Sequence, residues 1–134
     1  TDNALNAAEN VIIPVQAEPT SVRAFELLMY QVETIEKALR IHINVLAVVP
    51  NLVRNTNLSK SVLADFRDVI PHVTPFHIPL RSMLQDAWGA GASIFTYQAQ
   101  TSHDERVRQE ICTMYLELAQ YIMAKAGKEA SVGR

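Results

Sequence analysis

Four histidines and one cysteine are the residues of this chain whose types first suggest metal or nucleophilic chemistry. His72 and His77 lie five positions apart on a predicted strand, an odd spacing that sends their side chains to opposite faces. His42 and His103 fall at the ends of predicted elements without a ligand-spaced neighbour. Cys112 lies in a helical pattern, where we expect a small buried hydrophobic residue rather than a reactive thiol. The sequence therefore predicts no metal site and no catalytic residue.

The motifs that bind phosphates or expose a nucleophile are absent as well. No G-x-x-x-x-G-K-[ST] loop, no G-x-G-x-x-G turn and no G-x-S-x-G elbow occurs in the sequence. The one close glycine pair, Gly89 and Gly91, follows a predicted helix and indicates its end. The predicted strands end near Gln16, Asn51 and Ile78, not in the carboxylates of a phosphoacceptor site. Motif spacing alone therefore indicates no complete active site.

Asn51 is the polar side chain that we expect to mark a ligand site. It ends the stretch 43–51, I-N-V-L-A-V-V-P-N, which is apolar without alternation. Such a stretch is typical of an inner strand of a parallel sheet with helices on both faces. Ligands of open α/β sheets bind at the carboxyl edge of the strands. We therefore expect a site beside Asn51; the alternative is an asparagine that only forms a turn.

The elements that must position this residue alternate along the chain. The apolar patterns predict helices at 2–9, 22–39, 57–66, 84–88 and 102–127, and strands at 11–15, 43–51, 72–78 and 93–95. Asn57 is the predicted cap of the third helix, and the capping box Ser102-x-x-Glu105 opens the last one, which Gly127 ends. This order predicts a layered α/β domain.

Composition limits the class of protein. A chain of 134 residues, 49% hydrophobic and 19% charged, has the size and balance of one globular domain. The net charge of −2 gives no reason by itself to expect a polyanionic partner. No run reaches the ~18 apolar residues of a membrane span, and no signal peptide is recognisable at the start. A single cysteine fits a reducing cytoplasm. Because the chain begins with Thr1 and not with Met, we expect it to be a piece of a longer protein.

Five stretches, read as strings, resemble ParA/Soj-type partition ATPases in order and spacing. They are the stretch 3–16 with V-I-I-P-V-Q, the strand V-L-A-V-V-P-N, the loop N-T-N-L-S, the stretch I-P-L-R-S-M-L-Q-D-A, and Y-L-E-L-A in the last helix. The resemblance runs from residue 1 to about residue 126. It implies part of a mostly parallel sheet flanked by helices, of the P-loop NTPase-like SIMIBI type, lacking the amino-terminal P-loop half.

The resemblance also implies domain boundaries and a cofactor. Residues 1–127 would be the carboxyl-terminal portion of a ParA-like ATPase domain, and 128–134 a flexible tail. ATP, with Mg in the complete protein, would be the cofactor. Asn51 would read the adenine, and Pro79 with Leu80 would open the loop that closes over the base. An asparagine amide donates and accepts hydrogen bonds at once, which suits an adenine edge. The alternative for Pro79 is a plain strand terminator.

The DNA-binding positions of the family are where this sequence departs from it. Family members use arginines in the R-T-N-L-S and N-V-R stretches for sequence-independent DNA binding. Here those positions hold Asn55 and Met83, while Arg54 and Arg81 lie one and two residues earlier. Phosphate contact needs a long cation on the correct surface, not one fixed position. Arg54, Lys60 and Arg81 are therefore the predicted DNA-binding residues; the alternative is a solvated basic surface.

The resemblance as a whole implies an ATPase for plasmid or chromosome partition. The complete protein would be a cytoplasmic, nucleoid-associated homodimer that binds non-specific DNA and meets a ParB-type centromere-binding protein. The tail lacks the basic amphipathic helix with which MinD-like relatives dock on membranes, so no membrane partner is expected. Without a phosphate loop, whether this chain is an enzyme stays open. The alternative is a non-catalytic interaction or regulatory α/β module with a ParA-like fold.

Overall fold

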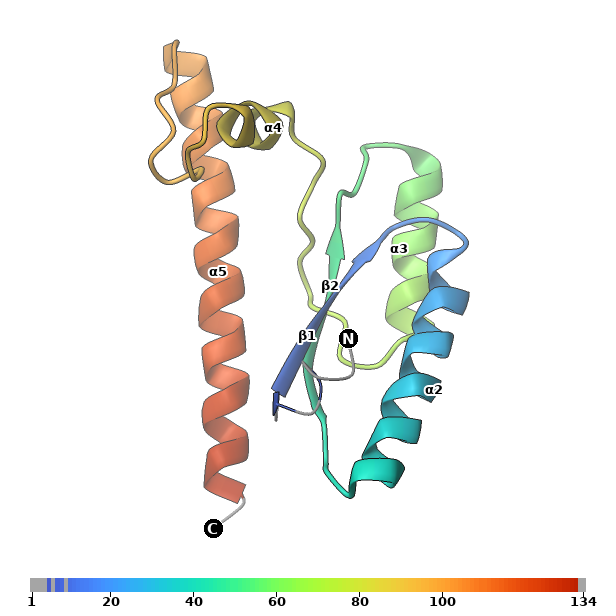
Figure 1. The fold of residues 1–134 in the computed structure, drawn as a ribbon. Coiled ribbons are helices and arrows are strands. Elements are labelled where there is room, and N and C mark those ends of the chain that lie inside the picture. The colour runs from blue at the N-terminus through green and yellow to red at the C-terminus, as the bar shows by residue number, and fades with distance from the viewer. Residues whose placement is uncertain (1–4, 6, 9, 133–134) are drawn as a thin grey trace. The chain divides into compact units, whose positions relative to one another are not determined.

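The computed structural model describes residues 5, 7, 8 and 10–132 of the chain (Figure 1). The chain divides into two compact units, Thr1–Leu80 and Arg81–Arg134. The helix predicted over 2–9 falls mainly outside the described residues. The predicted α/β class is confirmed for the described chain, which contains a parallel two-stranded sheet and four helices; the SIMIBI type and the boundary at residue 127 stay predictions.

The first unit is organised around two parallel strands. Strand β1, Asn10–Gln16, pairs with β2, Asn44–Asn51, from Asn10 opposite Asn44 to Gln16 opposite Asn51. An irregularity between Val11 and Ile12 shifts the register by one residue. Both strands lie where the sequence predicts them, and their carboxyl ends meet at one edge.

The third predicted strand, 72–78, is not a continuous strand in the structure. It touches β2 through one isolated parallel bridge, Val48 with Val73, and a second bridge, Val53 with Pro79, joins the residues that follow both segments. Pro75 and Pro79 have no N–H to donate, so they interrupt the hydrogen-bonded ladder. The segment nevertheless follows the free side of β2, so β2 has neighbours on both sides, as expected for an inner strand.

Helices α2, Ser21–Leu39, and α3, Asn57–Val69, lie on the same face of the sheet (Figure 1). Their apolar stripes form one core cluster with the strands, made of Ile13, Phe25, Val48, Val62, Phe66 and Ile70. Phe66 and Val48 are fully buried there. Burying one such side chain contributes roughly 1.5–3 kcal/mol, so this cluster fixes the helices on the sheet.

The cap of α3 is one residue earlier than predicted. Thr56, in extended conformation, accepts a hydrogen bond from the Ser59 N–H at 3.2 Å, so Thr56 and not Asn57 caps the helix. A threonine hydroxyl at this position satisfies one of the otherwise unpaired donors of the first turn. The cap fixes where the loop after β2 ends and α3 begins.

The second unit contains α4, Ser82–Gly89, and α5, Ser102–Val132. The strand predicted at 93–95 is wrong: this segment is a turn, in which the Ser93 carbonyl accepts the N–H groups of Thr96 and Tyr97. Arg108 of α5 holds the turn by donating to the carbonyls of Ile94 and Phe95 at 3.3 and 3.2 Å. These contacts tie the loop to the long helix.

Two predicted limits of α5 are also wrong. The cap is Thr101, whose Oγ1 accepts from the Asp104 N–H at 3.1 Å and donates to its carboxylate at 2.7 Å. The helix is therefore capped by Thr101 with Asp104, not by a capping box of Ser102 with Glu105. Gly127 does not end the helix, which continues to Val132. A glycine in a helix is tolerated at a cost of about 1 kcal/mol, so it ends a helix only where a left-handed residue is needed.

Candidate functional site at the carboxyl edge of the sheet

Asn51 lies where the sequence places it, at the carboxyl end of β2. It is half-buried and pairs in register with Gln16, the last residue of β1. The five residues before it, 46–50, are all buried, so the strand holds the Asn51 backbone in place. The first polar side chain after this apolar run therefore lies at the carboxyl edge of the sheet.

The Asn51 side chain also supports the turn that follows. Its Oδ1 accepts the backbone N–H of Leu52 at 2.8 Å. Leu52 has a φ of 53°, in the left-handed region that a residue with a Cβ rarely adopts. The hydrogen bond therefore stabilises a strained position, and the turn-forming role of Asn51 considered from the sequence is present in the structure.

The structure brings Pro79 and Leu80 to the same edge. Val53 donates its N–H to the Ile78 carbonyl at 3.1 Å, and the Leu80 N–H donates to the Val53 carbonyl at 2.9 Å. Pro79 forms a parallel bridge with Val53, two residues beyond Asn51. The residues predicted to contact a cofactor therefore lie on two neighbouring, hydrogen-bonded segments.

This edge combines one amide with apolar surface. Leu52 and Leu80 are 40% and 38% exposed, respectively. Oδ1 of Asn51 keeps a second lone pair beside the bond to Leu52, and no described residue bonds its Nδ2. An amide with one free donor and one free acceptor site, near exposed leucines, can bind the edge of a flat heterocycle. None of Asn51, Leu52, Pro79 and Leu80 carries a side-chain charge that could pair with a triphosphate.

Two of the predicted DNA-binding residues lie next in the same unit. Arg54 is in the loop after β2, and Lys60 is in the first turn of α3. Both side chains are exposed, and neither forms an ion pair within the described part of the chain. Arg81 is also exposed but belongs to the other unit, where it precedes α4. Arg54 and Lys60 therefore lie on one loop and helix start of the first unit, and Arg81 lies in the second unit.

The histidines do not form a metal site. Among the residues that the structure describes, no group of three or more His, Cys, Asp or Glu side chains is placed to hold a metal ion. Burial, and second the nearby Arg67 guanidinium, lower the pKa of His77 below its usual range. Both effects disfavour the protonated form of His77.

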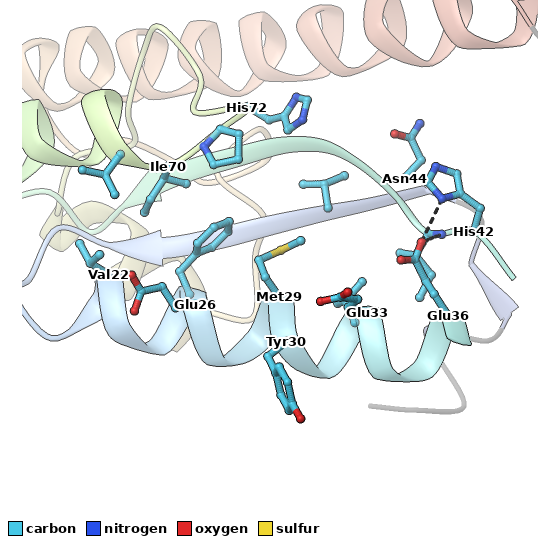
Figure 2. Close-up of a pocket in the computed structure, with 16 residues that line it drawn as sticks. Val22, Glu26, Met29, Tyr30, Glu33, Glu36, His42, Asn44, Ile70 and His72 are labelled. Atoms are coloured by element: carbon cyan, nitrogen blue, oxygen red, sulfur yellow. Dashed lines mark hydrogen bonds and ion pairs between the residues drawn. The ribbon is translucent and has the colours of Figure 1, made fainter. Parts of the chain in front are cut away.

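The sequence did not reveal a large cavity in the first unit. It has a volume of about 810 Å³ and runs along α2 from Val22 to Glu36, reaching the amino end of β2 at Asn44 (Figure 2). Its other walls come from residues 42–45 and from residues 69–72 at the end of α3. The only sequence signal for this cavity was the i, i+7 spacing of Glu26 and Glu33 on α2. That spacing is equally typical of a solvent-exposed helix face.

Comparison with known proteins adds no assignment, because no protein-family model and no curated protein matches the sequence. Within the described residues, no helix is both long enough and apolar enough to cross a membrane. The function that follows is therefore proposed from the sequence resemblance and from the geometry of the strand edge.

Proposed function

We propose that this chain is the carboxyl-terminal portion of an ATP-dependent DNA-partition ATPase of the ParA type. In this function Asn51, Pro79 and Leu80 contact the adenine of ATP. Arg54, Lys60 and Arg81 contact DNA phosphates, and Mg accompanies the nucleotide in the complete protein. The complete protein is a cytoplasmic, nucleoid-associated homodimer whose partner is a ParB-type centromere-binding protein.

One observation carries the proposal: Asn51 and the Pro79–Leu80 segment lie on adjacent hydrogen-bonded segments at one strand edge. These positions are 28 residues apart in the sequence and match two separate motifs of the resemblance. The carboxyl edge of a parallel sheet is also where α/β domains bind ligands. The coincidence of motif and position supports a shared role.

Adenine suits the groups that this edge presents. Adenine offers an N6 amino donor next to a ring-nitrogen acceptor, and an asparagine amide pairs with both at once. The second lone pair of Oδ1 accepts the amino group, while Nδ2 donates to the ring nitrogen. The bond from Leu52 to Oδ1 restricts the rotation of the amide and so reduces the entropy lost on binding.

The phosphates need groups that lie elsewhere. Lysine loops and helix amino termini bind triphosphates through charge and backbone N–H groups, and no lysine loop occurs in this sequence. In the proposed function these groups belong to an amino-terminal half of the complete protein. We therefore expect the 134-residue chain alone to bind Mg-ATP only weakly. Calorimetric titration of this chain with Mg-ATP measures the affinity. Micromolar affinity of this chain alone would show that the site is misplaced.

A titration of the complete protein with Mg-ATP and Mg-GTP tests the proposed function itself. We expect saturable binding of ATP, preference for adenine over guanine, and ATP-dependent binding to DNA of any sequence. Equal affinity for both nucleotides, or no binding of either, contradicts an adenine-reading edge.

A non-catalytic interaction or regulatory module is the second candidate. The observation in its favour is that Oδ1 of Asn51 already serves the turn at Leu52. An asparagine whose role is to hold this turn needs no ligand. A complete protein that lacks a K-G-G-x-G-K-[ST] loop upstream of this chain would favour this candidate.

A further inference from the structure

The cavity at the amino end of β2 is an open groove with an apolar floor. Buried Phe25 and Val32 of α2, Ile43 before β2 and Ile70 after α3 form the floor. Figure 2 shows Met29 pointing from α2 toward the strands, whereas Tyr30 points away from them. Above this buried floor, Val69 on the rim is exposed, so the groove also presents apolar surface to solvent.

The charges on this groove have one sign. Sixteen residues line it, and the charged ones among them are Glu26, Glu33 and Glu36, with no lysine or arginine. His42 and His72 are the other titratable groups of its wall. Because the whole chain has a net charge of only −2, this acidity is a local property. We call this site the acidic groove, lined by α2 and by residues 42–45 and 69–72.

The three glutamates differ in the interactions that their side chains already form within the chain. Glu36 accepts the Ile43 N–H at 2.7 Å and lies 3.0 Å from Nδ1 of His42, so it is committed to the start of β2 (Figure 2). Glu33 pairs with Lys37 at 2.7 Å, but both side chains are largely exposed and such pairs contribute little. Glu26 forms no ion pair with another described residue. Glu26 and Glu33 are therefore available to an external cation.

We propose that the acidic groove docks a basic amphipathic helix of a partner protein. Its apolar side would cover Met29 and the floor, and its lysines or arginines would lie against Glu26 and Glu33. Helices commonly bind in this way, with apolar anchors at i, i+3, i+4 and i+7. Complementary charge selects a basic partner over an acidic one. The lining of the acidic groove does not include Asn51, Pro79 or Leu80, so the two proposed sites share no residue.

The spacing of the two available acidic side chains fits about two turns of such a helix. Glu26 and Glu33 are seven residues apart on α2, which corresponds to roughly 10 Å at 1.5 Å per residue. A partner helix of at least about two turns lying along α2 therefore reaches both. A metal ion or a single amine would leave most of the apolar floor exposed.

A fluorescein-labelled 14-residue helical peptide with leucine on one face and lysine on the other is the probe. Fluorescence anisotropy on the full chain should show saturable binding. Glu26→Gln with Glu33→Gln should weaken it between about 2-fold and about 30-fold, the range for two exposed ion pairs. The matched control is Glu110→Gln with Glu117→Gln, an equal charge change at exposed positions of α5, which should leave binding unchanged. Val69→Lys, at a 63% exposed position of the rim, should weaken binding without affecting folding.

The location of the bound peptide and the dependence of binding on the sign of its charge test the proposal further. NMR amide shifts on titration should concentrate on the residues of the acidic groove, and a peptide with glutamate in place of lysine should not bind. The proposal is overturned by no saturable binding below about 1 mM, or by equal effects of the α2 and α5 variant pairs. It is also overturned if a dimer of this chain dissociates in the Val69→Lys variant while peptide binding is unchanged, since a second copy would then occupy the groove.

Discussion

Replacing Asn51 by Asp or by Ala separates the ligand role of this residue from its role in the turn. In the parent, Oδ1 of Asn51 accepts the Leu52 N–H at 2.8 Å. Asp keeps an oxygen that can accept this N–H, but it replaces the amide donor by a second acceptor. Ala removes both groups. The two variants therefore lose the same donor to adenine, and only Ala loses the turn.

The structure sets the size of each effect. The bond to Leu52 is a neutral hydrogen bond at a half-buried position, so Asn51→Ala should destabilise the fold by roughly 0.5–1.5 kcal/mol. The left-handed φ of 53° at Leu52 places the cost toward the upper end, because the bond supports a strained residue. Asn51→Asp should stay within about 0.5 kcal/mol of the parent. Both variants should lose roughly 1–3 kcal/mol of ATP binding, about 5-fold to 150-fold in Kd.

Two measurements check this prediction on the complete protein. Urea unfolding gives the stability of each variant, and calorimetric titration with Mg-ATP and Mg-GTP gives affinity and base preference. The aspartate should also lower the preference for adenine, because guanine offers amino donors that a carboxylate accepts. If Asn51→Asp binds ATP as tightly as the parent while Asn51→Ala is destabilised, Asn51 is a turn residue and the adenine assignment fails.

Three further predictions concern DNA, the core and acid stability. Substituting Arg54 and Arg81 together by Ala in the complete protein should weaken binding to all DNA sequences and flatten the log–log salt slope by roughly 0.9 per lost phosphate contact; an unchanged slope makes them ordinary surface charge. Phe66→Ala, at a fully buried position, should cost about 3–5 kcal/mol in urea unfolding, and a loss below 1 kcal/mol contradicts the described core. Hydrogen bonds, first from Arg108, lower the pKa of Glu105 from 4.5 to about 2. Because the folded-state value is the lower one, its stabilisation is present above pH 4.5 and lost toward pH 2, so the Tm difference from Glu105→Gln should shrink over that interval; a constant difference refutes this.

Local sequence was sufficient for the elements whose signal is periodic. The apolar run before Asn51 predicted an inner parallel strand, and the structure pairs β2 on both sides. The stripe of α2 and the position of Asn51 at a strand end were predicted correctly for the same reason. Burial on one face or on both faces leaves a repeating pattern, and such a pattern can be read without knowing the partner.

Boundaries and caps were less determined by the sequence. Thr56 and Asn57 are both good capping residues, as are Thr101 and Ser102, and the sequence favoured the second of each pair. The actual cap is the residue whose backbone leaves the helical region, which depends on how the preceding loop is held. Gly127 likewise carries a stop signal, yet α5 continues beyond it.

By itself, the sequence determined that the chain forms parallel strands and amphipathic helices, and that Asn51 ends the most buried strand, because these follow from side-chain type and period. Only the tertiary structure decided that Pro79 and Leu80 lie beside Val53, that residues 72–78 form one bridge with β2 in place of a third strand, and that an acidic groove opens along α2. Each of these depends on contacts between residues distant in the chain, whose geometry is fixed by packing and by backbone hydrogen bonds rather than by any local pattern.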